Sequence, residues 1–219
     1  MLAAAFRRQP DAVAAAADWF ARDAGLALLA SEADALQQAL QERPGQASLR
    51  LGPLPVLGQV GDATLQLHAA ECGLAGDLRA GLPLPIASDA CGVVVVQHLA
   101  DIACDPVQLL AECARVLVPG GRLWLFALNP LSPYRLRWRG HGPRVAEPIT
   151  WRRRLRLAGL QPEPVSRGLW PTWRIGLDPD FQDGAGLRAG FLLRAEKRRL
   201  PMTPLRAPAS LGWQAEPSA

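Results

Sequence analysis

Two polar side chains in this sequence stand directly after apolar runs that are long enough to be buried strands. His98 follows the run that ends at residue 96, and Asn129 follows residues 122–128. An imidazole titrates near neutral pH, so His98 is a candidate base or ligand-orienting residue. The alternative is a histidine hydrogen-bonded inside the fold. For Asn129, next to Pro130, a turn is the simpler interpretation and substrate contact is the functional one.

The densest charge in the chain lies between residues 135 and 156. This segment holds eight arginines and one acid, Glu147, for a net charge of +7, and Tyr134, Trp138 and Trp151 are interleaved with the arginines. Guanidinium groups bind phosphates and aromatic rings stack on bases. The pattern therefore suits an anionic small substrate or a nucleic acid, with a solvated helix face and an Arg-rich loop as the structural alternative.

Cysteine and histidine spacing predicts no metal site. The four cysteines and three histidines are scattered, with no CxxC pair, so we expect no metal ligands. We expect the cysteines to be buried thiols of a protein in a reducing, cytoplasmic compartment. No uncharged run reaches the ~20 residues of a membrane span, and acids interrupt the N-terminal segment, so we expect neither a membrane partner nor an export signal.

The elements that must position His98 and Asn129 form one crossover unit. Residues 93–96 are four consecutive valines, typical of a strand buried on both faces. Asp105 and Pro106 suit the N-cap and first position of a helix, and Gly120-Gly121 suit the turn before the next strand. Strand, helix and strand in this order predict parallel neighbours with a right-handed crossover. Ligands bind at the carboxyl ends of such strands.

Weaker patterns complete the organisation. We predict helices at residues 11–24 and 31–42 with Asp11 and Ser31 as N-caps, a short strand at 64–68, and a loop at 73–85. We also predict a basic helix at 149–158 and a late strand at 187–196, which has a possible partner strand around 161–165. The expected domains are N-terminal helices packed on the core (1–45), the main domain (46–200) with an Arg-rich insert or helix (135–160), and a tail (201–219) that is disordered at its end.

The segment from Leu84 to Pro130 resembles the class I S-adenosylmethionine-dependent methyltransferases, specifically the methyltransferase type 11 group. The resemblance is carried by Leu84-Pro85, the valine strand, His98, Asp105-Pro106, the run LAECARVLVPGGRL from Leu110 and Asn129-Pro130. The residues GFLLRAEKRRLPMTP, with Asn129-Pro-Leu-Ser132, resemble a small bacterial subgroup with a shortened first half.

The resemblance implies an α/β fold, a Rossmann-like open, twisted and mostly parallel sheet of about 6–7 strands with helices on both faces. It implies S-adenosylmethionine as cofactor, lying across the carboxyl ends of the first strands, and methyl transfer to an unknown acceptor. The implied cofactor-binding residues are Gly52, Glu71, Asp77, Leu78, Gln97 and His98, and the implied substrate-binding residues are Asn129, Tyr134 and Arg135.

The first-strand turn departs from the family pattern. Gly52 is the only one left of three glycines, and Pro53 and Pro55 restrict the backbone beside it. Only about a dozen residues separate Gly52 from Thr64, which is short for a helix and two loops. These departures favour an alternative function, a non-catalytic methyltransferase-like scaffold that binds a partner such as RNA through its Arg-rich segment.

Overall fold

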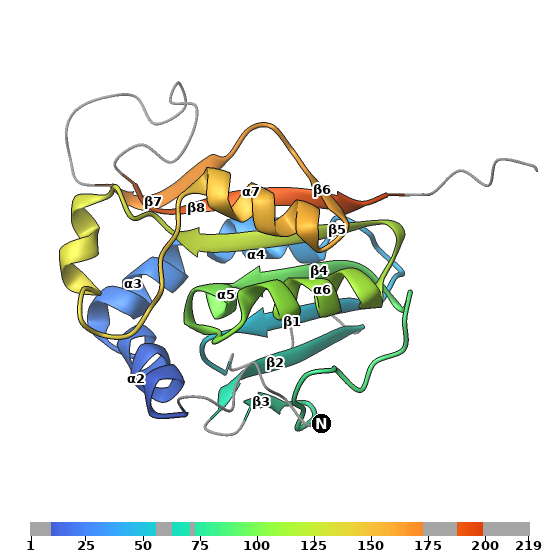
Figure 1. The fold of residues 1–219 in the computed structure, drawn as a ribbon, viewed down its shortest axis with the longest axis horizontal. Helices are drawn as coiled ribbons and strands as arrows, with labels where there is room; N and C mark the ends of the chain where they lie inside the picture. The colour runs from blue at the N-terminus through green and yellow to red at the C-terminus, as the bar shows by residue number, and fades with distance from the viewer. Residues whose placement is uncertain (1–9, 56–62, 71–72, 173–187, 199–219) are drawn as a thin grey trace, which may run out of the picture.

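The computed structural model describes residues 10–55, 63–70, 73–172 and 188–198. They build one twisted eight-stranded sheet with helices on both faces (Figure 1). The strand order is β3-β2-β1-β4-β5-β8-β6, with β7 also paired to β8. The predicted fold class is confirmed. The strands are β1 Ser48–Gly52, β2 Thr64–Ala70, β3 Gly73–Gly76, β4 Cys91–Gln97, β5 Leu117–Leu128, β6 Leu160–Pro162, β7 Arg167–Thr172 and β8 Arg188–Lys197.

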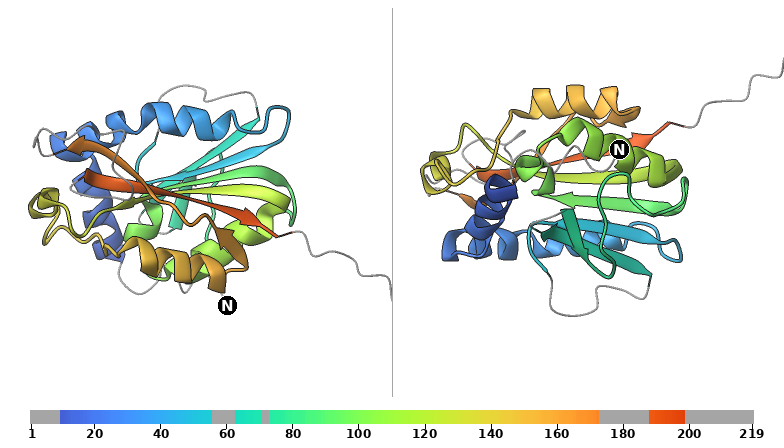
Figure 2. Two further views of the ribbon diagram at one scale, coloured as in Figure 1. Left: turned by 90° about the horizontal axis from the view of Figure 1, so that it is seen from above. Right: turned by 60° about the horizontal axis from the view of Figure 1, so that its bottom comes forward.

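The helices form three groups around the sheet. Helix α4 covers one face, and α5, α6 and α7 cover the other (Figure 2). Helices α2 and α3 lie beyond the carboxyl ends of β4 and β5 (Figure 1). Their bounds are α2 Pro10–Phe20, α3 Asp23–Ser31, α4 Ala33–Leu40, α5 Leu99–Ile102, α6 Pro106–Val116 and α7 Pro148–Leu157, with a 3-10 helix, η1, at Pro133–Arg137. No helix within these described ranges has the length and apolar character to cross a bilayer.

The central strands are parallel neighbours, as the valine strand and its crossover predicted. Val94 pairs with Leu123 and Val96 with Leu125 in a parallel ladder between β4 and β5, and β4 also pairs in parallel with β1. Every residue of β4 is buried. Because successive side chains point to opposite faces, Val94 and Val96 join the main core while Val93 and Val95 pack on the α4 face.

The N-terminal helices differ from the prediction because the chain turns between Phe20 and Asp23. The expected helix at 11–24 ends at Phe20, and α3 begins at Asp23. At Gly25, a Cβ would lie 2.5 Å from the Phe20 backbone, so a glycine is needed for this close approach. Ser31 is the last residue of α3 and not an N-cap; its hydroxyl donates to the Leu28 carbonyl at 2.6 Å.

Of the other local predictions, some are confirmed, one is wrong and some lie outside the described residues. Asp105 caps α6, since its side chain accepts from the backbone N–H groups of Val107 and Gln108, and the basic helix and late strand are confirmed as α7 and β8. The expected loop at 73–85 instead contains β3, antiparallel to β2. The predicted tail at 201–219, Glu71, and most of the segment between β1 and β2 lie outside the described residues.

Candidate functional site

The carboxyl ends of β1 and β4 meet at one edge of the sheet. Leu51 pairs with Val96, so Gly52 follows on β1 where Gln97 and His98 follow on β4. His98 leaves the strand with a φ of 51°, an uncommon conformation for a residue with a side chain, and α5 begins directly after it. This sharp turn directs the imidazole into the protein, where it is fully buried.

A chain of buried polar side chains runs along this edge. The guanidinium of Arg50 donates to Gln97 Oε1 at 2.6 Å, and Gln97 Nε2 donates to Glu32 Oε2 at 2.9 Å. The other Glu32 oxygen lies 2.8 Å from His98 Nε2, and His98 Nδ1 lies 3.1 Å from Asp101 Oδ2. These five residues, called the buried polar chain below, are each at most 3% exposed.

Charges within the buried polar chain balance, with two basic and two acidic side chains. Burial by itself would lower the pKa of His98, but the carboxylates of Glu32 and Asp101 outweigh it and raise that pKa to about 9. Burial lowers the pKa of Arg50 to about 10, with Glu32 acting in the opposite direction. The raised pKa favours the imidazolium form of His98, in which both ring nitrogens donate to carboxyl oxygens, while burial raises the pKa of its partner Asp101.

The hydrogen bonds of His98 favour the structural interpretation, because both ring nitrogens already lie within hydrogen-bond distance of a carboxyl oxygen. An imidazolium between two carboxylates has no lone pair with which to remove a proton, so the arrangement does not offer a general base. The geometry is that of a histidine hydrogen-bonded inside the fold, holding Glu32 and Asp101 in place at the edge.

Helix α2 covers the same edge through two aromatic residues. The ring of Phe20 stacks on His98 with centroids 5.1 Å apart, and Trp19 packs edge-on against Phe20 and Trp138. The Trp19 indole also donates to the Arg137 carbonyl at 2.7 Å. The N-terminal helices therefore exclude water from the buried polar chain and fix the segment after β5 against the edge.

Gly52 lies under the guanidinium of Arg50. A Cβ at residue 52 would come within 2.8 Å of Arg50 Nη2, so a side chain there would compete with the guanidinium for the same space. Among the described residues, Arg50 Nε and Asp101 Oδ1 are buried without a hydrogen-bond partner. Unsatisfied buried polar atoms beside a carboxyl edge are sites that a polar ligand can occupy.

Two other predicted cofactor residues lie elsewhere on the sheet. Asp77 follows the edge strand β3 and accepts from the Gln66 backbone N–H at 2.7 Å, whereas Gly52 pairs two residues further along β2, with His68. Leu78 is half-buried and packs against the main core. The structure therefore groups Gly52, Gln97 and His98, and places Asp77 and Leu78 apart from them.

The predicted substrate-binding residues follow β5. Asn129 is fully buried; its amide donates to the Arg188 carbonyl at 2.8 Å and accepts from the Leu131 N–H at 3.1 Å. These bonds shape the turn after the strand. Tyr134 is half-buried in η1, with the Arg137 guanidinium 5.5 Å from its ring centroid, and Arg135 is exposed.

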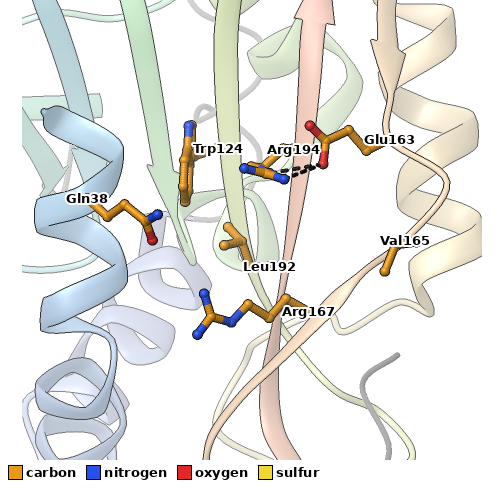
Figure 3. Close-up of a pocket in the computed structure, with 7 residues that line it drawn as sticks. All are labelled: Gln38, Trp124, Glu163, Val165, Arg167, Leu192 and Arg194. Atoms are coloured by element: carbon orange, nitrogen blue, oxygen red, sulfur yellow. Dashed lines mark hydrogen bonds and ion pairs between the residues drawn. The ribbon is translucent and has the colours of Figure 1, made fainter. Parts of the chain in front are cut away.

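A pocket of about 130 Å³ lies on the α4 face, between α4 and the strands β5, β7 and β8. Gln38 and Arg167 point into the space between helix and sheet, and Arg194 pairs with Glu163 at 2.9 Å (Figure 3). Arg194 also lies over the Trp124 ring. None of these residues was predicted as functional, and the pocket is separate from the buried polar chain.

Sequence patterns missed three members of the buried polar chain. Glu32 stands between two helices, where acids are usually solvated, and it lies 66 residues from His98. Asp101 follows His98 by three residues, a helical spacing that the sequence did offer as a signal. Arg50 did carry a signal, since a guanidinium between two leucines of a buried strand needs an acidic or polar partner. The described residues contain no cluster of three or more metal-ligating side chains.

Comparisons with known proteins give matches in sequence and in fold. Residues 61–125 match the family model described as a methyltransferase domain. The ubiquinone biosynthesis O-methyltransferase of Xanthomonas axonopodis pv. citri (strain 306) is 31% identical over 129 residues, covering 50% of this chain and 53% of that protein. The chain thus spans about half the length of the curated relatives it matches.

Solved structures show the same fold. An S-adenosylmethionine-dependent methyltransferase from Thermotoga maritima is 15% identical and superimposes with a TM-score of 0.51, covering 74% of this chain and 87% of its own. An S-adenosylmethionine-dependent methyltransferase from Mesorhizobium loti is 18% identical with a TM-score of 0.51, covering 76% and 97%. At these identities the likeness is one of fold.

Proposed function

We propose that the chain is a class I S-adenosylmethionine-dependent methyltransferase, which transfers a methyl group from S-adenosylmethionine to a small acceptor. The observation that carries this proposal is the buried polar chain beside Gly52, at the sheet edge where open α/β folds bind ligands. A glycine, a guanidinium and two carboxylates meet there, in a part of the protein that α2 closes to solvent.

In this proposal, the residues at this edge would hold the methionine part of the cofactor. Its carboxylate matches the Arg50 guanidinium, whose Nε has no partner among the described residues. Its ammonium matches the carboxylates of Glu32 and Asp101, of which Asp101 keeps one unpartnered oxygen. Gly52 leaves room for the Arg50 guanidinium, which occupies the space that a side chain at residue 52 would need.

Roles for the remaining predicted cofactor residues stay proposals. Glu71 would accept from the ribose hydroxyls, and Asp77 with Leu78 would flank the adenine. Gln97 would hold Glu32 and Arg50 at a fixed separation, as its two hydrogen bonds do here.

S-adenosylmethionine supplies an electrophilic methyl group on a sulfonium when bound. The chain's own contribution is to bind, orient and exclude water. His98 keeps its proton between Glu32 and Asp101, so it orients the edge and does not activate the acceptor. An acceptor that arrives already deprotonated needs no base from the protein.

An oxygen acceptor is the class we propose, supported by the name of the curated relative, an O-methyltransferase. Acceptor contacts would come from Tyr134 and Arg135 on η1, with Asn129 shaping the turn that presents them. We also propose a cytoplasmic location, supported by Cys91, Cys104 and Cys113, which are free thiols.

Calorimetry with S-adenosylmethionine and S-adenosylhomocysteine tests the cofactor site. We expect micromolar binding of both, weakened at least ~10-fold by Gly52→Ala, because the added methyl group would crowd the space beside Arg50. The matched control is Gly45→Ala, where nothing lies within 4 Å of the new Cβ. Absence of heat at millimolar cofactor, in protein shown to be folded by circular dichroism, would refute the proposal.

A further inference from the structure

The Arg-rich segment presents a surface that the cofactor site does not use. It follows β5 through η1, a loop and α7, and it carries eight arginines. Within the described residues, none of these arginines forms an ion pair with a carboxylate. Such a concentration of unpaired positive charge favours an anionic partner.

The aromatic residues of this segment are not available to that partner. Trp138 and Trp151 are buried, the first against Trp19 and the second on the core side of α7 with Arg154 over its ring. Tyr134 is half-buried beside Arg137. Binding of single-stranded nucleic acid relies on aromatic rings on which bases stack, so the structure removes the feature that suggested RNA.

The apolar side chains that the Arg-rich segment exposes to solvent are aliphatic. Of the seven large apolar residues exposed in the described chain, four lie between residues 131 and 157 and are about two-thirds exposed: Leu131 67%, Leu136 70%, Ile149 67% and Leu157 68%. Leu136 stands between Arg135 and Arg137. Large aliphatic groups interspersed with cations are the composition of an interfacial segment.

Helix α7 repeats the same composition on its outer side. Trp151 and Leu155 face the core, and the opposite side carries Ile149, Arg153, Arg156 and Leu157 at helical spacing. Figure 1 shows the chain passing from η1, beyond the carboxyl end of β5, across to α7 in front of the sheet. Arginine and aliphatic residues are thus mixed on both short helices.

We infer that this surface, the exposed side chains of residues 131–139 other than Arg135 together with the outer side of α7, binds an anionic lipid membrane peripherally, which departs from the expectation of no membrane partner drawn from the sequence. Aliphatic side chains enter the headgroup boundary while guanidinium groups bind lipid phosphates, the two contributions of an interfacial segment. The Trp19 bond to the Arg137 carbonyl holds η1 in one orientation, so the leucines are presented without an ordering cost.

Vesicle flotation of the full chain tests the inference. We expect binding to phosphatidylcholine vesicles that contain about one-third phosphatidylglycerol, and little binding to pure phosphatidylcholine. Arg139→Gln with Arg153→Gln and Arg156→Gln should weaken it at least ~10-fold, and Leu131→Ser with Leu136→Ser should weaken it as well. Matched controls are Arg22→Gln with Arg79→Gln and Leu26→Ser, which are exposed elsewhere and should bind as the parent does.

Binding of a single-stranded RNA oligonucleotide, measured by fluorescence anisotropy, tests the competing possibility of a nucleic-acid partner. Tight RNA binding that depends on the arginines but not on the leucines, without vesicle binding, would overturn the inference. So would vesicle binding that the leucine pair does not change. Cofactor binding, measured by calorimetry on the same variants, reports separately on the proposed enzyme, since the surface does not overlap the buried polar chain.

Discussion

Glu32 is the side chain on which the candidate site depends most. It accepts from Gln97 and His98 at once, and it is fully buried at the junction of α3 and α4. The polar chain is tolerated inside the protein because each positive group has a carboxylate within hydrogen-bond distance or one side chain away. Removing one charge from such a set leaves the others uncompensated in a medium that solvates them poorly.

Glu32→Gln should therefore destabilise the protein by about 3 kcal/mol, because it leaves one excess positive charge in the interior. Urea unfolding followed by circular dichroism measures the change. Asp89→Asn is the matched control; Asp89 pairs with Lys197 but is half-exposed, so its loss should cost less than about 1 kcal/mol. Equal losses in the two variants would show that the buried polar chain contributes no more than a surface ion pair.

The raised pKa of His98 gives a pH dependence with a definite sign. The folded protein holds the His98 proton to a pKa of about 9, whereas an unfolded histidine releases it near 6.5. Between these values the folded state binds more protons, so the free energy of unfolding falls as pH rises. The stabilisation is complete below pH 6.5 and disappears through pH 9.

Urea midpoints between pH 6.5 and 8.5 measure this dependence. The slope should approach about −1.4 kcal/mol per pH unit, and His98→Gln should flatten it. The range stops at pH 8.5 because burial raises the thiol pKa values of Cys91 and Cys113, which adds a dependence of the same sign at higher pH. A parent protein whose stability is level across this range would contradict the imidazolium assignment.

At the scale of elements, the hairpin of β2 and β3 depends on the glycine that ends β3. Gly76 has a φ of 144°, and a Cβ there would lie 2.2 Å from the Gln66 carbonyl oxygen. The strands cannot pair at this register with any side chain at residue 76, because the clash is with backbone that cannot turn aside. This explains why a segment that looks like a loop from its glycines forms a strand.

Gly76→Ala should cost about 3 kcal/mol, the sum of a left-handed backbone and a backbone clash. Gly45→Ala shares the positive φ, at 79°, but meets nothing within 4 Å, so it should cost about 1 kcal/mol. Thermal unfolding of Gly76→Ala and Gly45→Ala distinguishes the cost of the backbone clash from the cost of the positive φ. Indistinguishable melting temperatures would mean that β3 is not paired as described.

At the scale of the molecule, one core joins the first helix to the last strand. Trp19 and Phe20 of α2 belong to the same buried cluster as Phe191 and Leu193 of β8. The N-terminal helices are therefore part of the folded domain, and their packing brings Glu32 to the sheet edge. Because the main core contains residues from α2 to β8, we expect the described domain to unfold as a unit.

Unfolding by urea should accordingly give coincident transitions for tryptophan fluorescence and far-ultraviolet circular dichroism. The buried tryptophans Trp19, Trp124, Trp138 and Trp151 sample α2, the central sheet, η1 and α7. An earlier fluorescence transition would indicate that the edge around α2 opens separately from the sheet. The same measurement on the Glu32→Gln variant then shows whether the buried polar chain couples the unfolding of α2 to that of the sheet.

Local sequence patterns determined the parallel pair β4 and β5, the Asp105 cap and the basic helix α7. Four valines in a row, a capping pair and a charged segment between Pro148 and Gly159 act through neighbouring residues, so they can be recognised along the chain. The position of His98 after its strand followed from the same pattern. Gly52 and Gln97 were placed by resemblance, and the structure brings them to the same edge.

Only the tertiary structure decided what His98 does and which side chains surround it. Glu32 lies 66 residues away from His98 in the sequence, and Arg50 reaches Gln97 across 47 residues. Protonation inside a protein depends on burial and on charges brought close by folding, neither of which a spacing encodes. Burial set by folding also decides which apolar side chains of the Arg-rich segment are hidden. Its tryptophans Trp138 and Trp151 are buried, whereas its leucines Leu131 and Leu136 are exposed.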